Sequence, residues 1–335
     1  MPTQKALLVK ELGKPLVLVD NHDIPEPGPG QVQIKVSVAG LNPHDQRSRD
    51  WGLLIADMLP FVLGKDVVGT VAKLGEGVKD LKVGDRVMSL ADSATDSSQS
   101  GLQEYAVADV VHCAKIPADL SDSEAATLPT NLSSVFIALY ITLGLPAPWA
   151  KDISNPEKLL VVGGGSNCGR LTVQLAKLAG IPKIVVVGGD EHELKALGAT
   201  HVIDRHGDED AVSTRVQHAV GDDLVYAFDT VNFPDGLGLA LKSLSKEKNG
   251  KLARLVPMGS VEDTKGHELL DVLGNRHFKD PLCLLLWERL TRYVEEGSIR
   301  PTPYSVWSGL EPSVVNAALD EYRDGKKVTK PQIHH

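Results

Sequence analysis

A glycine-rich segment follows a short apolar run, Leu159–Val162, in the second half of the chain. Glycines let a backbone turn sharply and approach an anionic group closely, and amides at the start of a following helix bind its charge. A strand, such a loop and a helix in this order are typical of dinucleotide sites, although a plain turn is the alternative. The predicted pyrophosphate-binding residues are Gly163, Gly164, Gly165, Ser166, Asn167, Cys168 and Gly169.

The type of dinucleotide depends on the residues that follow the next two expected strands. The first of these strands ends at Gly188 and Gly189, with Asp190 after them, and Arg205 follows the second. An acid at the strand end would bind the ribose 2′-hydroxyl and repel a 2′-phosphate. Because the strand end is glycine, we expect NADPH, with NADH less favoured, and a site that includes Gly188, Gly189 and Arg205. The other interpretation of Arg205 is a solvated loop charge.

Strands and helices alternate around these residues. The expected strands are 159–162, 184–187, 201–203, 224–228 and 252–256, and the expected helices are 171–178, 191–197 and 208–220. Continuous apolar strands suit a parallel sheet that is covered on both faces. The fold class is therefore α/β, with a doubly wound parallel sheet.

The rest of the chain is rich in short strands and turns. Val32–Val36 alternates apolar and polar residues, as a half-buried strand does. Further strands are expected at 67–71, 75–78, 83–87 and 301–307, and helices at 281–296 and 311–322. The polar stretch 91–101 is expected to be an exposed loop.

Bulk composition narrows the range of partners. The 335 residues suit two domains, and a formal net charge of −9 argues against nucleic acid and anionic membranes. No apolar run approaches the length of a membrane span, and the first residues lack the apolar core of a signal peptide. The three cysteines are widely separated, which fits a reducing compartment. We expect a cytoplasmic monomer or homodimer with a small-molecule substrate, and assign no role to His334 and His335.

Several short motifs resemble the medium-chain dehydrogenase/reductase superfamily over nearly the whole length. They are Gly40–Asp45, Gly64–Val71, Gly84–Val87, Gly101–Tyr105, Ala125–Pro129 and the glycine loop with Leu175-Ala176-Lys177 behind it. The resemblance implies a GroES-like β-rich domain at 1–125 and 276–335 and a Rossmann domain at 126–275, with the active site in the cleft between them. Within the superfamily the chain resembles zinc-free quinone reductases and, more closely, fungal trans-acting enoyl reductases of polyketide pathways.

Zinc-dependent members of this superfamily present Cys, then Gly-His-Glu, then a second Cys to the metal. The resemblance places Asn42, Gly64-Lys65-Asp66 and Thr130 at these positions. An amide, an ammonium and a hydroxyl replace thiolate and imidazole ligands, and an ammonium would repel Zn²⁺. The stretch 91–101, where a four-cysteine structural site would lie, has no cysteine. We therefore expect no metal.

Without a Lewis acid, reduction of a carbon–carbon double bond conjugated to a carbonyl fits better than alcohol oxidation. Hydride adds to the β-carbon, and hydrogen-bond donors stabilise the enolate oxygen. The resemblance implies catalytic roles for Lys65, Asn42 and Ser134, contact with the cofactor for His44 and Asp45, and contact with the substrate, a polyketide or other enone, for Thr130 and Asn131.

Several assignments stay open at this level. Lys65 could instead be a surface lysine, His44 a loop histidine and Ser134 a helix serine that bonds its own backbone. Arg47 stands where many quinone reductases have Tyr, so the proton donor is open and solvent could supply the proton. The alternatives to an enoyl reductase are a quinone reductase and a dinucleotide-binding protein without turnover.

Overall fold

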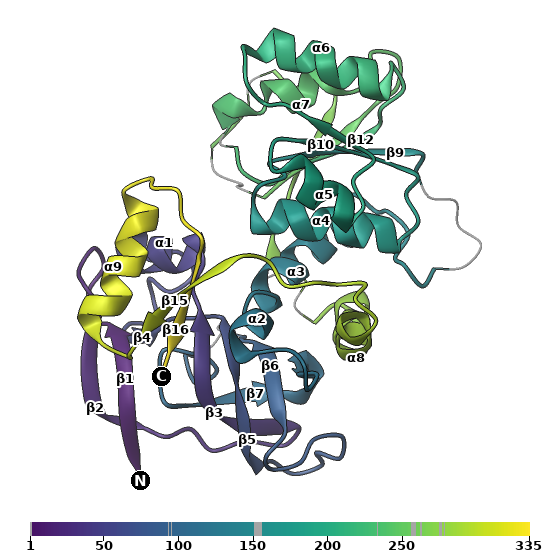
Figure 1. Cartoon of the computed structure of the whole chain (residues 1–335). Coiled ribbons are helices and arrows are strands. Elements are labelled where there is room, and N and C mark those ends of the chain that lie inside the picture. Colours follow the sequence, from purple (N-terminus) through teal and green to yellow (C-terminus); the bar gives the residue numbers. More distant parts are fainter. Residues whose placement is uncertain are drawn as a thin grey trace. The chain divides into compact units, whose positions relative to one another are not determined.

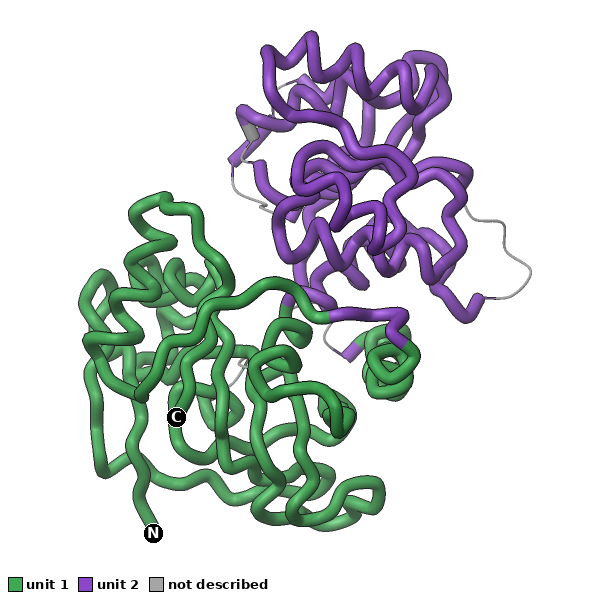
Figure 2. Tube along the Cα trace, in the orientation of Figure 1, with its two compact units in different colours: residues 1–130, 280–296, 301–335 green, residues 131–279, 297–300 purple. Residues whose placement is uncertain are grey.

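The computed structural model describes residues 2–92, 94, 96–150, 156–232, 234–255, 259–261, 263–274, 277 and 279–335. The chain divides into two compact units (Figure 2). Unit 1 contains residues 1–130, 280–296 and 301–335, and unit 2 contains residues 131–279 and 297–300. The predicted domain boundaries at 125–126 and 275–276 remain a proposal, and residues 275 and 276 lie outside the described residues.

Unit 1 is built mainly from antiparallel strands. They are β1 (Thr3–Val9), β2 (Val17–Asp23), β3 (Gln31–Gly40), β4 (Phe61–Val62), β5 (Asp66–Leu74), β6 (Arg86–Leu90), β7 (Tyr105–Asp109), β8 (Cys113–Lys115), β15 (Tyr304–Ser308) and β16 (Lys330–His334). A seven-stranded sheet runs in the order β15-β16-β3-β5-β6-β8, with β7 also paired to β3, and β2-β1-β4 form a smaller sheet. His334 ends β16, so the last strand of the chain lies inside the larger sheet.

The helices of unit 1 are α1 (Pro43–Trp51), α2 (Asp122–Ala125), η1 (Val110–His112), α8 (Pro281–Glu295) and α9 (Pro312–Arg323), while α3 (Pro129–Phe136) continues from unit 1 into unit 2. The sequence analysis predicted helices α8 and α9 of unit 1 but not its other helices. In α1, Asn42 is the N-cap, Pro43 occupies the first turn and Asp45 completes a capping box. His44 and Asp45 are therefore helix residues. The strand predicted at 75–78 is wrong, because Gly75–Gly77 form a turn with Gly77 at φ +81°.

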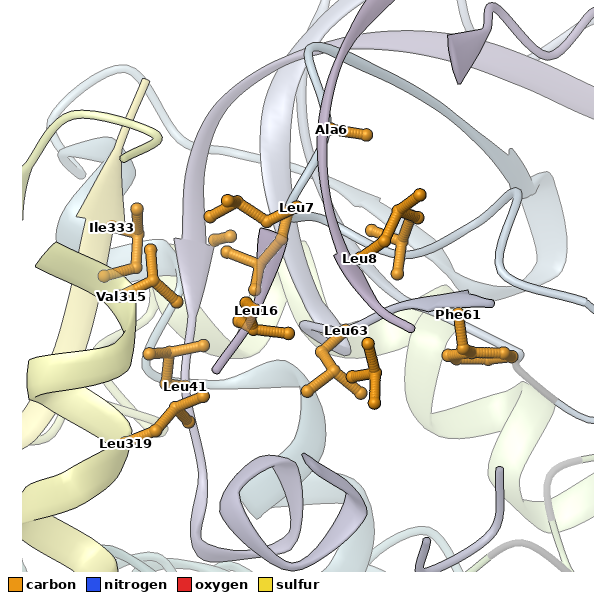
Figure 3. Packing of buried hydrophobic residues seen from close by; sticks show 14 of the residues in the cluster. Ala6, Leu7, Leu8, Leu16, Leu41, Phe61, Leu63, Val315, Leu319 and Ile333 are labelled. Carbon is orange, nitrogen blue, oxygen red and sulfur yellow. The ribbon is translucent and has the colours of Figure 1, made fainter. Parts of the chain in front are cut away.

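One hydrophobic cluster supports the candidate site residues of unit 1. It joins β1, β4, α9 and β16, and Figure 3 shows Leu41, Leu63 and Ile333 within it. Leu41 directly precedes Asn42, and Leu63 lies two residues before Lys65. All three apolar side chains are nearly or fully buried. Their packing fixes the backbone from which the polar side chains of the site extend.

Unit 2 contains a parallel six-stranded sheet. Its strands are β9 (Lys158–Val162), β10 (Lys183–Val187), β11 (His201–Ile203), β12 (Tyr226–Asp229), β13 (Lys251–Arg254) and β14 (Glu268–Asp271). Their order, β11-β10-β9-β12-β13-β14, reverses direction next to β9 and is the order of a doubly wound dinucleotide-binding sheet. The predicted fold class is confirmed. The strand β14 was not predicted, and Val256, the predicted end of the 252–256 strand, lies outside the described residues.

Helices cover both faces of this sheet (Figure 1). They are α4 (Asn167–Leu178), α5 (Glu191–Leu197), α6 (Glu209–Val220) and α7 (Gly238–Ser243), with η2 (Ile137–Thr142) and η3 (Pro234–Gly236). Side chains of α6 and α7 pack on Leu160, Val162, Val185 and Val187. The alternate residues of β9 and β10 are also buried and face the side that α4 contacts. Burial on both faces explains why these strands are continuously apolar.

One helical run contradicts the expectation that no apolar segment approaches a membrane-spanning length. Among the described residues, Asp122–Thr142 forms 21 residues of helix that are long enough and apolar enough to cross a membrane. Of its apolar window, 72% is buried within the structure. Burial of this extent is what the core helix of a folded domain shows.

Candidate functional site

The glycine loop lies at the carboxyl end of β9, beside the reversal of strand order. Gly163 has φ +93°, a conformation that favours glycine. A Cβ on Gly164 would lie 2.3 Å from the Val186 side chain, and a Cβ on Gly169 would lie 2.3 Å from the Gly163 oxygen. A Cβ on Gly165 would meet nothing closer than 3.4 Å. The fold itself requires Gly163, Gly164 and Gly169, whereas a Cβ on Gly165 would make ordinary van der Waals contact with the Gly189 backbone.

The start of α4 offers amides to an anionic ligand. Ser166 is the N-cap, and its Oγ accepts a hydrogen bond from the Gly169 amide at 2.8 Å. The amides of Asn167 and Cys168 lie in the first turn, where a helix provides no backbone acceptor. Together with the positive end of a 12-residue helix, these amides can hold a phosphate.

The ends of β10 and β11 show how the two dinucleotides could be distinguished. Asp190 is the N-cap of α5, and its Oδ1 accepts the Glu193 amide at 2.7 Å. A Cβ on Gly188 would lie 3.2 Å from Cδ of Arg205, so the arginine stem lies over this glycine. Asp190 is engaged in capping a helix, and Arg205, whose stem lies beside Gly188, is exposed. This arrangement suits a phosphate better than a hydroxyl.

Two further residues of unit 2 support the loop and were missed by the sequence analysis. Thr230 follows β12, and its Oγ1 lies 2.9 Å from Ser166 Oγ and 2.9 Å from the Val162 oxygen. Arg170 donates from Nε to Glu193 at 2.7 Å and from Nη1 to the Gly165 carbonyl. Neither residue belongs to a recognisable motif, because both act through contacts that only the folded sheet creates.

In unit 1 a group of buried polar residues, here called the ion cluster, joins Asn42, Asp45, Asp66 and Lys330. All four side chains are 3% exposed or less. Lys330 Nζ donates to Asn42 Oδ1 at 2.7 Å and to Asp66 Oδ2. Asn42 Nδ2 donates to Asp66 Oδ2 at 2.7 Å, and Asp45 accepts the amides of Asn42 at 2.8 Å and Gly64 at 3.1 Å. Since an ammonium only donates and a carboxylate only accepts, the orientation of the Asn42 amide is unambiguous.

The ion cluster engages two of the predicted residues. Asn42 already uses its amide oxygen on Lys330 and an N–H on Asp66, and it is almost fully buried. Asp45 uses both carboxylate oxygens on backbone amides. Both side chains therefore have protein partners in this structure, and their direct contact with substrate or cofactor stays a prediction. Asp66 and Lys330 are the residues that the sequence analysis missed as partners.

Lys65 and His44 lie beside the ion cluster and line a small pocket with Leu54, Ile55 and Phe61. Lys65 is half-buried, and no described side chain forms an ion pair or a hydrogen bond with its ammonium. Burial lowers the pKa of Lys65, while the charges of Asp45, Asp92 and Asp66 oppose that shift. Burial likewise lowers the pKa of His44, which favours a neutral imidazole at pH 7.

The other predicted residues lie on α3. The Thr130 amide donates to Asp66 Oδ1 at 2.6 Å, which ties the start of α3 to the ion cluster. Asn131 Nδ2 donates to Cys168 Sγ at 3.6 Å, so this side chain contacts the glycine loop within unit 2. Ser134 is half-buried on the same helix. The structure thus links Asn42, Asp45 and Thr130 through hydrogen bonds with Asp66 and the backbone, and it places Asn131 beside Cys168 of the glycine loop.

Two family models match the chain. The model described as "Alcohol dehydrogenase GroES-like domain" matches residues 28–118, and the model described as "Zinc-binding dehydrogenase" matches residues 168–269. The first corresponds to part of unit 1, and the second covers the glycine loop from Cys168 onward and most of the strands of unit 2.

Known proteins are similar over almost the whole length. Dehydrogenase orsE of Emericella nidulans is 30% identical, with 98% of this chain and 99% of the relative covered. Trans-enoyl reductase himH of Aspergillus japonicus is 32% identical, with 90% and 88% covered. A mycobacterial protein solved in complex with NADPH has a TM-score of 0.76 at 22% identity, with 99% of this chain and 100% of that chain covered. At that identity the likeness to the solved structure concerns the fold.

Proposed function

The chain belongs to the medium-chain dehydrogenase/reductase superfamily of oxidoreductases, and on that premise we propose that it is an NADPH-dependent, zinc-independent reductase of a conjugated carbon–carbon double bond. When bound, the dinucleotide would supply the hydride for the β-carbon. Relatives that carry the name trans-enoyl reductase support this choice of reaction. The observation that carries it is the half-buried Lys65, whose ammonium forms no ion pair or hydrogen bond with any residue that the structure describes.

Lys65 suits a developing enolate oxygen. A half-buried cation without a protein partner is costly, and an anionic ligand is the partner that offsets this cost. In conjugate reduction the negative charge moves to the carbonyl oxygen, and a donor aimed at that oxygen stabilises the transition state. Burial lowers the pKa of the neighbouring His44, so this residue would add an imidazole rather than a second cation. The source of the α-carbon proton stays open, with solvent as one candidate.

The proposed cofactor is NADPH, held by residues of unit 2. Gly165 and the amides of Asn167 and Cys168 would receive the pyrophosphate. Gly188, Gly189 and Arg205 would receive the 2′-phosphate, because Asp190 is committed to capping α5. The mycobacterial protein that was solved with NADPH, which has the same fold, supports this choice.

We propose that the protein works without zinc, although one matching family model carries zinc-binding in its name. The Asn42 amide is bonded to Asp66, Thr130 offers a hydroxyl and Lys65 an ammonium, so these positions lack the thiolate and imidazole ligands that zinc prefers. Purified active protein is expected to contain far less than one zinc per chain, and chelators should leave turnover unchanged. One tightly held zinc ion per chain would contradict the proposal. A cytoplasmic location and a monomeric or homodimeric state remain predictions.

NADPH oxidation across a panel of enones, enoyl thioesters and quinones tests the function. We expect turnover with the conjugated alkenes and saturated carbonyl products. Turnover confined to quinones would show a quinone reductase, and binding of NADPH without any turnover would show a non-catalytic protein.

A further inference from the structure

The ion cluster contains an unequal number of charges. Asp45 and Asp66 are two buried carboxylates, whereas Lys330 is the one ammonium bonded within the cluster. Lys65 lies in sequence directly before Asp66, and both carboxylates act electrostatically on it. Two lysines thus stand near the same buried anions, and one of them is bonded while the other is not.

The geometry explains which lysine is bonded. Lys330 extends from β16, whose Ile333 is fully buried in the hydrophobic cluster, so the strand is firmly held. From there Nζ reaches both Asp66 Oδ2 and Asn42 Oδ1. Asp66 also accepts from Asn42 and from the Thr130 amide, so its oxygens already have donors without Lys65. Asp45 is similarly occupied by two backbone amides.

We propose that Lys330 is a positioning residue: by occupying Asp66 it leaves the ammonium of Lys65 unpaired for the substrate oxygen. This inference rests on the proposed function, in which Lys65 stabilises the enolate. If Lys330 loses its charge, Asp66 becomes a buried anion without a counter-ion, which is strongly unfavourable. Lys65 is then the nearest cation along the chain that can respond, and the same attraction draws it away from the substrate.

A double-mutant cycle of Lys330→Met and Lys65→Met tests this dependence. Lys330→Met alone should lower kcat/KM for a conjugated alkene roughly 10- to 100-fold. In the Lys65→Met background the same change should lower kcat/KM by about twofold or less, because the residue through which Lys330 acts is gone. Lys330→Arg, which keeps the charge, should retain more activity than Lys330→Met. Lys327→Met, an exposed lysine on the same segment, is the matched control and should be unchanged.

A purely structural role for Lys330 predicts a different result. Lys330→Met would then lower kcat/KM by the same factor in both backgrounds, and that additivity would overturn the inference. If Lys330→Met does not fold, Lys330→Gln replaces it in the cycle, since its amide can still donate to Asp66 but carries no charge. Failure of the proposed function gives a separate signal, because the native protein would then not oxidise NADPH with any conjugated alkene. Native turnover in Lys65→Met would instead show that Lys65 does not act on the substrate, and it would overturn the inference about Lys330.

Discussion

Lys65 and Arg205 are the two side chains whose positive charges the proposed function uses. Each was singled out in the sequence by its position, Lys65 at a metal-ligand position and Arg205 after the third strand. The structure adds the burial and the neighbours of these two side chains. Lys65 is half-buried and has no ion-pair partner in the described part of the chain, and the stem of Arg205 lies over Gly188.

Replacing Lys65 by Met keeps a similar length and removes the charge. An oxyanion donor is typically worth about 3 kcal/mol in the transition state, so kcat should fall roughly a hundredfold. Steady-state turnover of a conjugated alkene provides the measurement, and the exposed Lys79→Met is the control. Equal turnover of Lys65→Met and native protein would show that Lys65 does not face the substrate.

Replacing Arg205 by Ala should reduce the preference for NADPH. The guanidinium would meet the 2′-phosphate, which NADH lacks, so affinity for NADPH should fall while affinity for NADH changes little. Titration of intrinsic fluorescence with each dinucleotide measures the two constants, and Lys248→Ala, an exposed lysine elsewhere in unit 2, is the control. An unchanged ratio would remove Arg205 from the selection, and a native preference for NADH would point to Asp190 instead.

At the scale of elements, substitutions at the junction of β9 and α4 can distinguish a loss of dinucleotide affinity from a loss of stability. Gly165→Ala adds a Cβ with ordinary contacts, so the melting temperature should hold while dinucleotide affinity falls. Gly169→Ala pushes a Cβ against the Gly163 oxygen, so it should lower both the melting temperature and the dinucleotide affinity. The loss in unfolding free energy should be about 1–3 kcal/mol. Calorimetry and dinucleotide titration on both variants give the comparison. Native affinity in Gly165→Ala would mean that the loop is only a turn.

The sequence predicted the elements of unit 2 better than those of unit 1. Helix α5 and strand β11 lie at the predicted residues, because an apolar strand and a capped helix are local signals. Strand β14 was missed, since Glu268–Asp271 combines two acids with two leucines and pairs only at the sheet edge. Helix α1 was missed although Asn42, Pro43 and Asp45 form a helix start, because its buried residues are polar and no apolar periodicity marks it.

The candidate site likewise has a part that the sequence predicts and a part that it does not. The glycine loop was predictable, because its strand, turn and helix are contiguous in sequence. The ion cluster was not, since Lys330 lies 264 residues from Asp66 and nothing in its local pattern distinguishes a buried lysine from an exposed one. The hydrogen-bond partners of Asn42 were likewise not predictable, because they are set by tertiary contacts.

At the scale of the whole molecule, the two units divide the proposed reaction. Unit 2 carries the dinucleotide-binding residues, and unit 1 carries Lys65 with the ion cluster. Helix α3 begins in unit 1 and continues in unit 2, where Thr130 bonds Asp66 and the next residue, Asn131, bonds Cys168.

The central claim is that hydride reaches the β-carbon of a conjugated alkene, and the fate of a deuterium label tests it most directly. The measurement uses NADPH deuterated at the transferred position and an enone or enoyl thioester that the protein turns over, with the product analysed by NMR. The proposed function predicts deuterium at the β-carbon, an unlabelled α-carbon and an intact carbonyl group. Deuterium on a carbinol carbon would contradict it and show a carbonyl reductase.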